Sequence, residues 1–344
     1  MKILIKQMLQ WMAAITAALF IMNLFCFIYY SPFLELKREH GANTGFLLPG
    51  MRGVYGMEGY CMAGSDKRGY VNRDLPLEKD YYLVAGASHS EGLFLPVEDR
   101  FSDVLNEKLK EGEGLKVYNI ARSGNFFSVV TQHFDGILGE FPDAKGIIIE
   151  TDSLSYDTKA WRDSMIQVGY DEGESIEAIM SGMSSMDKLK LNIKRCLPLV
   201  RELHKQFLTM QSSSGELRES DVYKGDFDEE YKRALNELLA FLRSRTDKEL
   251  IIVFHPAVSI EESGDMKLLS TGAEELFGEA CRANDIEFID MSERFLEAYE
   301  EEHIVPMGFS NTTMASGHTN KAAHRMMAEE IYKVIRSEKE SDQP

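Results

Sequence analysis

From Tyr81 onward, short apolar segments alternate with longer amphipathic ones, and this rhythm limits the fold more than any other feature of the sequence. Apolar runs of this length are typical of buried strands, and the segments between them have the spacing of covering helices. Strands that alternate with helices are usually parallel neighbours in one sheet. The pattern predicts strands at 81–85, 116–120, 146–150, 250–254 and 287–290, and helices at 101–110, 126–140 and 319–336.

These segments predict an α/β domain over residues 81–336, a three-layer α/β/α sandwich around a doubly wound parallel sheet of about five strands. Residues 31–80 are rich in glycine and turn-forming residues, so we expect an irregular segment that wraps the domain. The charged residues 337–344 are expected to form a disordered tail.

A long polar and helical segment, residues 158–246, separates the third and fourth predicted strands. It is too long for one crossover, and we expect a helical insertion or lid. Its apolar residues recur near helical spacing, which is also what helices that merely cover the sheet would show. The residues in question are Leu189, Ile193, Leu197, Leu203 and Leu208.

Residues 8–30 form an apolar run without a charged side chain, long enough for a helix to cross a bilayer. Two lysines, Lys2 and Lys6, precede the run, which favours a cytoplasmic amino end. The bulky residues at its carboxyl end do not fit a signal peptidase site. We expect residues 1–30 to be an uncleaved single-pass signal anchor in the cell membrane, with the remaining chain extracytoplasmic. The alternative is a buried N-terminal helix.

Acidic residues outnumber basic ones by 56 to 38, and the formal net charge is −18. This charge repels a phosphate backbone, and the sequence contains no evident basic patch, so we expect no nucleic-acid partner. The same charge argues against a face that lies flat on an anionic membrane. Insertion of the apolar run is therefore the expected mode of membrane contact.

The four cysteines indicate neither a disulfide framework nor a metal site. Cys26 lies in the apolar run, and the three that remain are an odd and sparse set. They do not cluster with histidines at metal-ligand spacing, and no glycine turn is followed by the Lys-Ser/Thr pair of a nucleotide site. We expect neither a metal nor a cofactor.

A serine and a histidine stand where a site at the sheet edge would form. Ser88 lies in a glycine-flanked turn, residues 86–92, directly after the first predicted strand of the sheet. Such a turn exposes the hydroxyl and brings backbone N–H groups near it. The hydroxyl needs a base, and His318 precedes the last predicted helix at the same edge. Taken alone, Ser88 is more typical of a turn or helix-capping serine, and His318 of a surface histidine beside a helix cap.

Three segments, taken in order, resemble the sequence blocks of the SGNH/GDSL hydrolase family. Residues 86–92 are similar to its Gly-Asp-Ser block, residues 117–124 to its second block, and residues 318–328 to its last block with a His-x-Asn element. The resemblance covers residues 81–336 and implies a flavodoxin-like SGNH hydrolase fold.

The same resemblance implies roles for particular residues. Ser88 would be the nucleophile and His318 its general base, while the backbone N–H groups of Ser88 and Gly124 would form the oxyanion hole. His324 matches a second histidine of the last block.

Two features depart from the family pattern. Ala315 stands where the acid that orients the catalytic histidine is expected, so either a Ser-His dyad or another acid is implied. Asp290, at the end of the last predicted strand, is a candidate for that acid, and a helix-capping role is its alternative. The third block lacks its asparagine and has Glu150-Thr151-Asp152 instead, which leaves Thr151 or, better, the amide of Asn125 as a donor.

The sequence therefore predicts an SGNH-type esterase or O-acyltransferase that forms an acyl-Ser88 intermediate. With the expected anchor, the substrate would be an O-acyl ester on a cell-envelope glycan or lipid-linked glycan. The alternative is a non-catalytic envelope protein that keeps the fold for binding or assembly.

Overall fold

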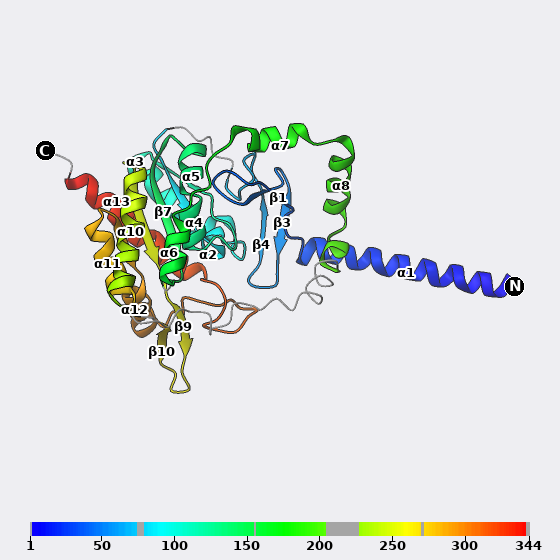
Figure 1. Ribbon diagram of the computed structural model, residues 1–344. Coiled ribbons are helices and arrows are strands. Elements are labelled where there is room, and N and C mark those ends of the chain that lie inside the picture. Colours follow the sequence, from blue (N-terminus) through cyan, green and yellow to red (C-terminus); the bar gives the residue numbers. More distant parts are fainter. Residues whose placement is uncertain (1, 74–78, 155, 204–226, 270–271, 342–344) are drawn as a thin grey trace.

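The computed structural model describes residues 2–73, 79–154, 156–203, 227–269 and 272–341. A five-stranded parallel sheet forms its centre, with helices on both faces, and a long helix projects from one side (Figure 1). The strands are β5 (Tyr81–Ala85), β6 (Lys116–Asn119), β7 (Ala144–Thr151), β8 (Glu249–Phe254) and β11 (Glu287–Asp290).

The strand order across the sheet is β11-β8-β7-β5-β6, and every neighbouring pair is parallel. In chain order this is 5-4-3-1-2, which is the flavodoxin-like winding. The predicted fold class is therefore confirmed. The chain reverses its direction of winding at β5, since β6 lies on one side of this strand and β7 on the other. The crevice beyond the carboxyl ends of these strands is where open α/β sheets bind ligands.

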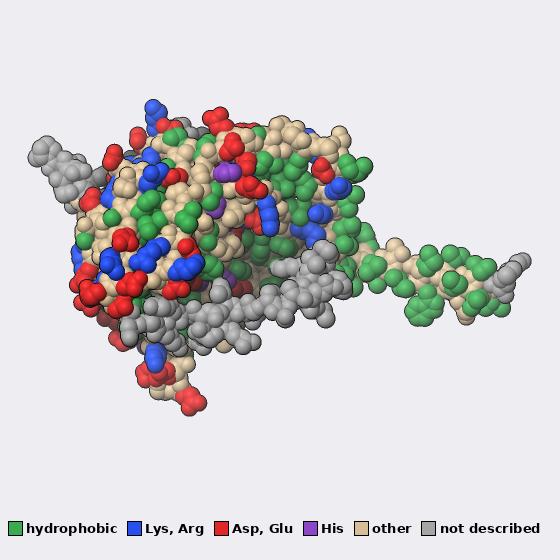
Figure 2. Space-filling model, in the orientation of Figure 1, with side chains coloured by type: hydrophobic (Ala, Val, Ile, Leu, Met, Phe, Trp, Pro, Cys, Tyr) green, Lys and Arg blue, Asp and Glu red, His purple; other side chains and the backbone are tan. Residues whose placement is uncertain are grey.

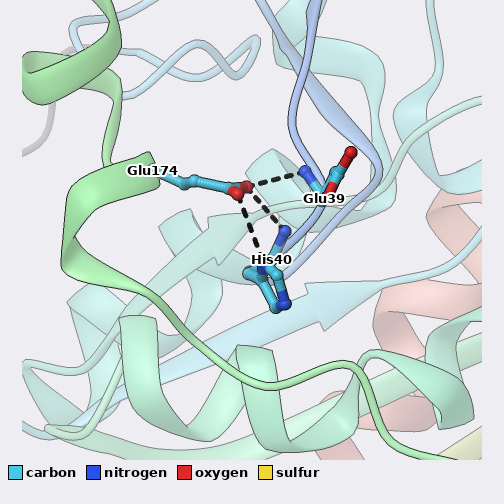
Figure 3. Close-up of side chains that lie close together, drawn as sticks. All are labelled: Glu39, His40 and Glu174. Carbon is cyan, nitrogen blue, oxygen red and sulfur yellow. Dashed lines mark hydrogen bonds and ion pairs between the residues drawn. The ribbon is translucent and has the colours of Figure 1, made fainter.

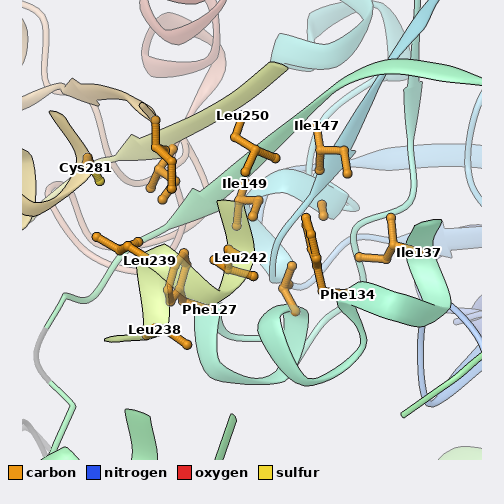
Figure 4. Close-up of a cluster of buried hydrophobic side chains, with 14 of the residues drawn as sticks. Phe127, Phe134, Ile137, Ile147, Ile149, Leu238, Leu239, Leu242, Leu250 and Cys281 are labelled. Atoms are coloured by element: carbon orange, nitrogen blue, oxygen red, sulfur yellow. The ribbon is translucent and has the colours of Figure 1, made fainter. Parts of the chain in front are cut away.

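Two hydrophobic clusters cover the two faces of the sheet. Along β5, Leu83 and Ala85 point into one cluster while Tyr82 and Val84 point into the other, as the two-residue period of a strand requires. The first cluster is shown in Figure 4, where Phe127 and Leu238 from the covering helices pack against the strands.

The helices divide between these faces as a doubly wound sheet requires. The first face is covered by α4 (Phe127–Gln132), α5 (Phe134–Glu140), α6 (Thr158–Ser164), α10 (Glu229–Arg245) and α11 (Glu274–Ala283). The second is covered by α3 (Phe101–Glu113), α12 (Ser292–Glu302) and α13 (Lys321–Ser341).

The segment before the sheet is more regular than its glycine content suggests. Instead of an irregular wrap, it forms two antiparallel hairpins, β1 (Glu35–Lys37) with β2 (Gly45–Leu47) and β3 (Arg52–Tyr55) with β4 (Cys61–Gly64). A third hairpin, β9 (Ala257–Ile260) with β10 (Met266–Leu269), follows the fourth strand of the sheet. Short strands between glycines carry too weak a sequence pattern to be recognised.

The predicted insertion divides into two structurally different parts. Trp161 of α6 and Leu238 of α10 are buried in the core, so these helices are part of the layer over the sheet. The chain between them, with η2 (Glu172–Glu174), α7 (Ile176–Gly182) and α8 (Ser185–Cys196), runs away from the sheet (Figure 1). The apolar residues on which the prediction of an insertion was based are exposed here, and they do not cover the sheet as the alternative required: Leu189, Ile193, Leu197 and Leu203. Leu208 lies outside the described residues.

Helix α1 (Lys2–Tyr29) is long and apolar enough to cross a membrane, and its apolar window is not buried against the rest of the protein. At the other end of the chain, α13 continues to Ser341, beyond the predicted end of the last helix. The start of the predicted tail is thus helical, while residues 342–344 lie outside the described residues.

Candidate active site

Ser88 is the first residue of a short helix, α2 (Ser88–Glu91), directly beyond the carboxyl end of β5. The turn that leads to it depends on Gly86, whose φ of +154° is rare for other residues. A Cβ atom at Gly86 would also lie only 2.6 Å from Glu150 Oε2. The serine is partly exposed, so a substrate can reach its hydroxyl.

The structure brings Ser88 and His318 together, although 230 residues separate them in the chain. Ser88 Oγ lies 2.8 Å from His318 Nε2, which is hydrogen-bonding distance. The imidazole lies between two other rings, with the centroid of Phe94 at 4.0 Å and that of His89 at 4.8 Å. These contacts restrict rotation of the ring, so its Nε2 stays directed at the serine.

The carboxylate beside His318 belongs to Glu58, a residue that no sequence pattern singled out. Glu58 Oε2 lies 2.7 Å from His318 Nδ1, and its Oε1 accepts the backbone N–H of His318, also at 2.7 Å. Burial by itself would raise the pKa of Glu58, but the hydrogen bonds from His318 outweigh it and hold that pKa below its usual value. Glu58 is therefore an ionised acceptor that favours an Nδ1–H tautomer.

The interpretation of Asp290 as the orienting acid is not supported. Its carboxylate accepts the backbone N–H of Ser292 at 2.9 Å, at the start of α12, which is the capping role named as its alternative. The position of the family acid, Ala315, lies in a left-handed turn with a φ of +58°. The carboxylate that contacts His318 comes instead from Glu58, in the turn of the β3–β4 hairpin.

The loop before α13 holds that hairpin in position. Asn311 accepts the N–H of Gly59 at 2.8 Å, and its Nδ2 donates to the carbonyl oxygens of Gly56 and Gly59 at 3.1 Å each. Gly317 allows the close approach from the other side, because a Cβ atom there would lie 2.1 Å from Glu58 Oε1. In the sequence, the local sign that the backbone at Glu58 is held in a tight turn is the pair of glycines around it, Gly56 and Gly59.

Two backbone N–H groups are available as oxyanion donors. Within the described residues, neither the N–H of Ser88 nor that of Gly124 donates to a protein acceptor. Gly124 has a φ of +87°, and nothing lies within 4 Å of where its Cβ would be. The loop that carries Gly124 is tied to the turn before Ser88 by the hydrogen bond from Arg122 N to Gly86 O at 3.0 Å.

Glu91, at the end of the helix that begins with Ser88, also holds the Gly124 loop. Its Oε1 accepts Arg122 Nη1 at 2.7 Å, and its Oε2 accepts both the N–H of Ser123 at 2.9 Å and the hydroxyl of Ser123 at 2.5 Å. The serine turn and the candidate oxyanion loop are thereby fixed relative to one another by a single buried carboxylate.

The residues considered for the third oxyanion donor have other partners. The amide of Asn125 donates to Asn43 Oδ1 in a buried network, and within the described residues no hydrogen bond joins it to Ser88. The hydroxyl of Thr151 donates to the carbonyl oxygen of Ser153 at 2.6 Å. A donor role for Asn125 remains a prediction, and the one for Thr151 is not supported.

Glu150, where the family resemblance implies an asparagine, lies on β7 and holds the turn that carries Ser88. It is buried and accepts hydrogen bonds from His255 Nε2 at 2.9 Å, from Ser90 Oγ at 2.7 Å and from the N–H of Ala87 at 3.3 Å. Burial alone would raise the pKa of Glu150, and the contact with His255 reverses this and lowers it. The carboxylate therefore stabilises the turn rather than an oxyanion.

Two further histidines are buried near the site. Thr319 N donates to His89 Nδ1 at 3.2 Å, and Phe101 N donates to His324 Nδ1 at 2.9 Å, so both rings act as acceptors. Burial lowers the pKa of His324 to about 3 and that of His89 well below its usual value. Both side chains are therefore neutral near pH 7, and His324 caps α3 instead of reaching the serine.

A second group of titratable side chains, Glu39, His40 and Glu174, lies on the surface (Figure 3). Glu174 Oε2 accepts the backbone N–H groups of Glu39 and His40 at 2.7 Å each, and His40 Nδ1 lies 3.1 Å from Glu174 Oε1. The ligand atoms are close enough for a metal ion, but Glu174 already uses its oxygens to tie η2 to the loop between β1 and β2. We assign the group this structural role.

Comparisons with known proteins give similar structures and no similar sequences. No protein-family model matches the chain, and no curated protein matches its sequence. The crystal structure of TesA has 13% identity and a TM-score of 0.39, over 75% of this chain and 99% of that one. The psychrotrophic esterase EstA from Pseudoalteromonas sp. has 12% identity and a TM-score of 0.37, over 75% and 98%.

A member of the lipolytic G-D-S-L family from Veillonella parvula has 10% identity and a TM-score of 0.34, over 74% of this chain and 97% of that one. At these levels of identity and superposition, the activities of the solved structures carry no argument for this chain. Its chemistry is argued from the arrangement of Ser88, His318 and Glu58.

Proposed function

We propose that this protein is a serine-dependent esterase or O-acyltransferase with Ser88 as nucleophile, His318 as general base and Glu58 as the acid that orients the base. The observation that supports this is the continuous hydrogen-bonded chain from Glu58 Oε2 through His318 to Ser88 Oγ, with distances of 2.7 and 2.8 Å. A hydroxyl, an imidazole and a carboxylate in this arrangement have the geometry of a catalytic triad.

In the proposed reaction, Ser88 Oγ attacks the carbonyl carbon of an ester while His318 Nε2 accepts the hydroxyl proton. Glu58 stabilises the imidazolium that forms. The N–H groups of Ser88 and Gly124 donate to the negative oxygen of the tetrahedral intermediate. When the intermediate collapses, the bond to the alcohol breaks, His318 returns the proton to that alcohol, and the acyl group remains on Ser88.

The second half of the reaction regenerates the serine. Water or an acceptor hydroxyl gives its proton to His318 and attacks the acyl carbon, after which Ser88 leaves and recovers the proton. Water as the acceptor gives hydrolysis, and a sugar hydroxyl gives acyl transfer. The exclusion of water from the acyl-enzyme decides between them.

We place this reaction outside the cytoplasmic membrane, on an O-acyl ester of a cell-envelope glycan or a lipid-linked glycan. Support comes from α1, which has the length and apolar surface of a membrane span and whose apolar stretch is not buried against the domain. A tethered domain acts only on substrates at or near the same membrane, and polymers and lipid-linked glycans of the envelope meet that condition.

The test is labelling of the purified full chain with a fluorophosphonate probe, which reacts with activated serines. Wild type and Ser316→Ala should be labelled equally, because Ser316 is an exposed neighbour of His318 whose hydroxyl donates to the carbonyl oxygen of Thr313. Ser88→Ala should not be labelled. Equal labelling of Ser88→Ala would contradict the mechanism, and no labelling of wild type would favour the alternative of a non-catalytic binding protein.

A second measurement separates hydrolysis from transfer. The wild-type chain is given an activated acyl ester with and without a sugar acceptor, and the released acid and the acylated sugar are quantified. An acyltransferase would form acylated sugar at the expense of free acid, while an esterase would release the same amount of acid in both conditions.

A further inference from the structure

Helix α8 lies apart from the helices that cover the sheet and is exposed along its length. No residue of α8 is buried, and of the helix only Leu191 packs against a hydrophobic cluster of the domain. On the other side of the helix, Met186, Leu189 and Ile193 are 60%, 51% and 50% exposed. Their spacing of three and four residues places them on one helix face, so α8 presents an apolar stripe that the described residues do not cover.

The charge of α8 is opposite to that of the whole chain. The helix contains four basic residues and one acidic residue, a local charge of +3, whereas the chain carries −18. Lys190 and Lys194 lie beside the apolar stripe at helical spacing, and Lys188 and Arg195 lie farther around the helix. An apolar face flanked by lysines is the pattern of a helix that lies in the interface of an anionic membrane.

Two hydrogen bonds from α1 to the chain at the end of α8 indicate how deep α8 would lie in a membrane that α1 crosses. Asn23 is a polar residue inside the apolar run of α1, and its Nδ2 donates to the carbonyl oxygen of Cys196 at 3.1 Å while its Oδ1 accepts the N–H of Leu199 at 3.1 Å. Asn23 is six residues before Tyr29, the aromatic end of α1, which corresponds to about 9 Å along a helix. Interfacial helices bury their apolar face to a depth of about 5–10 Å, so the carboxyl end of α8 reaches that level.

The direction of α8 is also that of a helix lying in the plane of a membrane that α1 crosses. It runs across the line of α1 rather than along it, beside the point where α1 meets the domain (Figure 1). Hydrophobic side chains continue from α8 to the base of α1 on the space-filling surface (Figure 2). A cavity of about 380 Å³ lies at this junction and is lined by Phe27, Ile28, Met51, Arg52 and Arg195, among others.

We propose that α8 is an interfacial helix that lies on the surface of the bilayer that α1 crosses. Met186, Leu189 and Ile193 insert between the lipids, and the lysines of α8 contact the headgroups of anionic phospholipids. The domain is then held against the membrane at two places instead of hanging from one tether. The proposal depends on α1 as a membrane span and is independent of the chemistry at Ser88.

The test uses the full chain in nanodiscs of phosphatidylglycerol and phosphatidylcholine, with a nitroxide label on a single introduced cysteine. Cys26→Ser and Cys196→Ser remove the two cysteines that are not buried. Labels at Leu189→Cys and Ile193→Cys are compared with a label at Ile260→Cys, an exposed apolar position on β9 that is remote from α1. The readout is spin relaxation by oxygen, which concentrates in lipid, and by a water-soluble nickel chelate.

We expect the labels on α8 to be relaxed by oxygen and protected from the chelate, and the label on β9 to be accessible to the chelate. Equal chelate access at positions 189 and 260 would overturn the proposal, because the stripe would then face water. Protection of position 189 from both reagents would also overturn it, since a protein surface, such as a second copy of the chain, would then cover the stripe. The mass of the purified protein is measured as well. A mass that showed α1 to be cleaved off would overturn the proposal, because α1 is the span on which it depends.

Charge reversal tests the headgroup contact. The variant Lys188→Glu, Lys190→Glu, Lys194→Glu should increase chelate access at position 189 several-fold in discs that contain phosphatidylglycerol. The matched control Lys159→Glu, Lys232→Glu, Lys333→Glu reverses three exposed lysines on α6, α10 and α13 and should leave it unchanged. Unchanged access in the α8 variant would contradict the contact with anionic headgroups.

Discussion

Glu58 accepts two hydrogen bonds from His318, one from ring Nδ1 and one from the backbone N–H, although 260 residues separate the two in the chain. The bidentate contact fixes both the tautomer of the ring and the position of the loop that carries it. It makes the β3–β4 hairpin part of the candidate active site.

The first prediction concerns this carboxylate. Glu58→Gln should reduce the rate of fluorophosphonate labelling of Ser88 by about 10²–10⁴-fold, because the amide neither holds the Nδ1–H tautomer nor stabilises an imidazolium. Asp290→Asn is the control and should label at the wild-type rate. The opposite outcome, a normal rate for Glu58→Gln and a slow rate for Asp290→Asn, would restore Asp290 as the orienting acid.

The second prediction concerns Gly317, beside the same carboxylate. Gly317→Ala should slow labelling strongly, because the added Cβ would lie 2.1 Å from Glu58 Oε1. Gly264→Ala, in the β9–β10 hairpin, carries a similar backbone cost at a φ of +92° with open space around the Cβ. It should lose about 1–2 kcal/mol of stability in denaturant unfolding and keep its labelling rate. Equal rates in the two variants would show that the close approach to Glu58 does not matter.

The third prediction concerns Glu91 and the loop that carries Gly124. Glu91→Gln removes an acceptor for Arg122 or Ser123, so the candidate oxyanion donor loses its fixed position. We expect kcat for an activated ester to fall by about 10–100-fold with a smaller change in KM, because an oxyanion donor acts mainly in the transition state. Glu35→Gln is the control, because it removes the charge of the exposed carboxylate that lies 2.9 Å from Arg122 Nη2 on the other side of the guanidinium, and it should have little effect.

The fourth prediction concerns stability in mild acid. The folded protein keeps His324 neutral down to a pKa of about 3, whereas the unfolded chain protonates this residue near its usual pKa of about 6.5. Between these values the unfolded state binds one more proton, so the free energy of unfolding should fall by about 1.4 kcal/mol for each pH unit as the pH decreases below about 6.5. Burial lowers the pKa of His89 as well, so this histidine acts in the same direction, whereas burial raises the pKa of Asp103 to about 6 and gives a contribution of the opposite sign.

The contribution of His324 is isolated by substitution. His324→Asn keeps an acceptor for the N–H of Phe101. Between about pH 5 and 6.5 it should reduce the slope of the unfolding free energy against pH by about 1.4 kcal/mol per pH unit, which corresponds to one proton. His303→Asn changes an exposed histidine in the left-handed turn after α12 and serves as the control. An unchanged slope in His324→Asn would show that this ring is not kept neutral by the fold.

The fold was predictable because its signals are local. Buried parallel strands are continuous apolar runs, and Tyr81–Ala85 and Glu287–Asp290 have the predicted limits in the structure. Ser88 and His318 were predictable for a related reason, since residues that follow strands of one parallel sheet meet at the same edge. The hairpins before the sheet were missed because their strands are only three or four residues long.

Glu58 was not predictable by the same reasoning. It does not follow a strand of the central sheet, and its distance along the chain from His318 leaves no spacing to recognise. Asp290 was chosen because it ends a strand, yet its carboxylate is used within two residues, by the N–H of Ser292. Asp290 thus bonds the nearby N–H of Ser292 and does not contact the distant His318.

The origin of Glu58 also determines which fragment of this chain is useful in the laboratory. A recombinant fragment cut at Tyr81 would contain every strand of the central sheet, both Ser88 and His318, and would lack the carboxylate. Such a fragment would give misleadingly slow kinetics that reflect the choice of boundary. A fragment chosen to test the proposed activity therefore has to include the β3–β4 hairpin as well as the sheet.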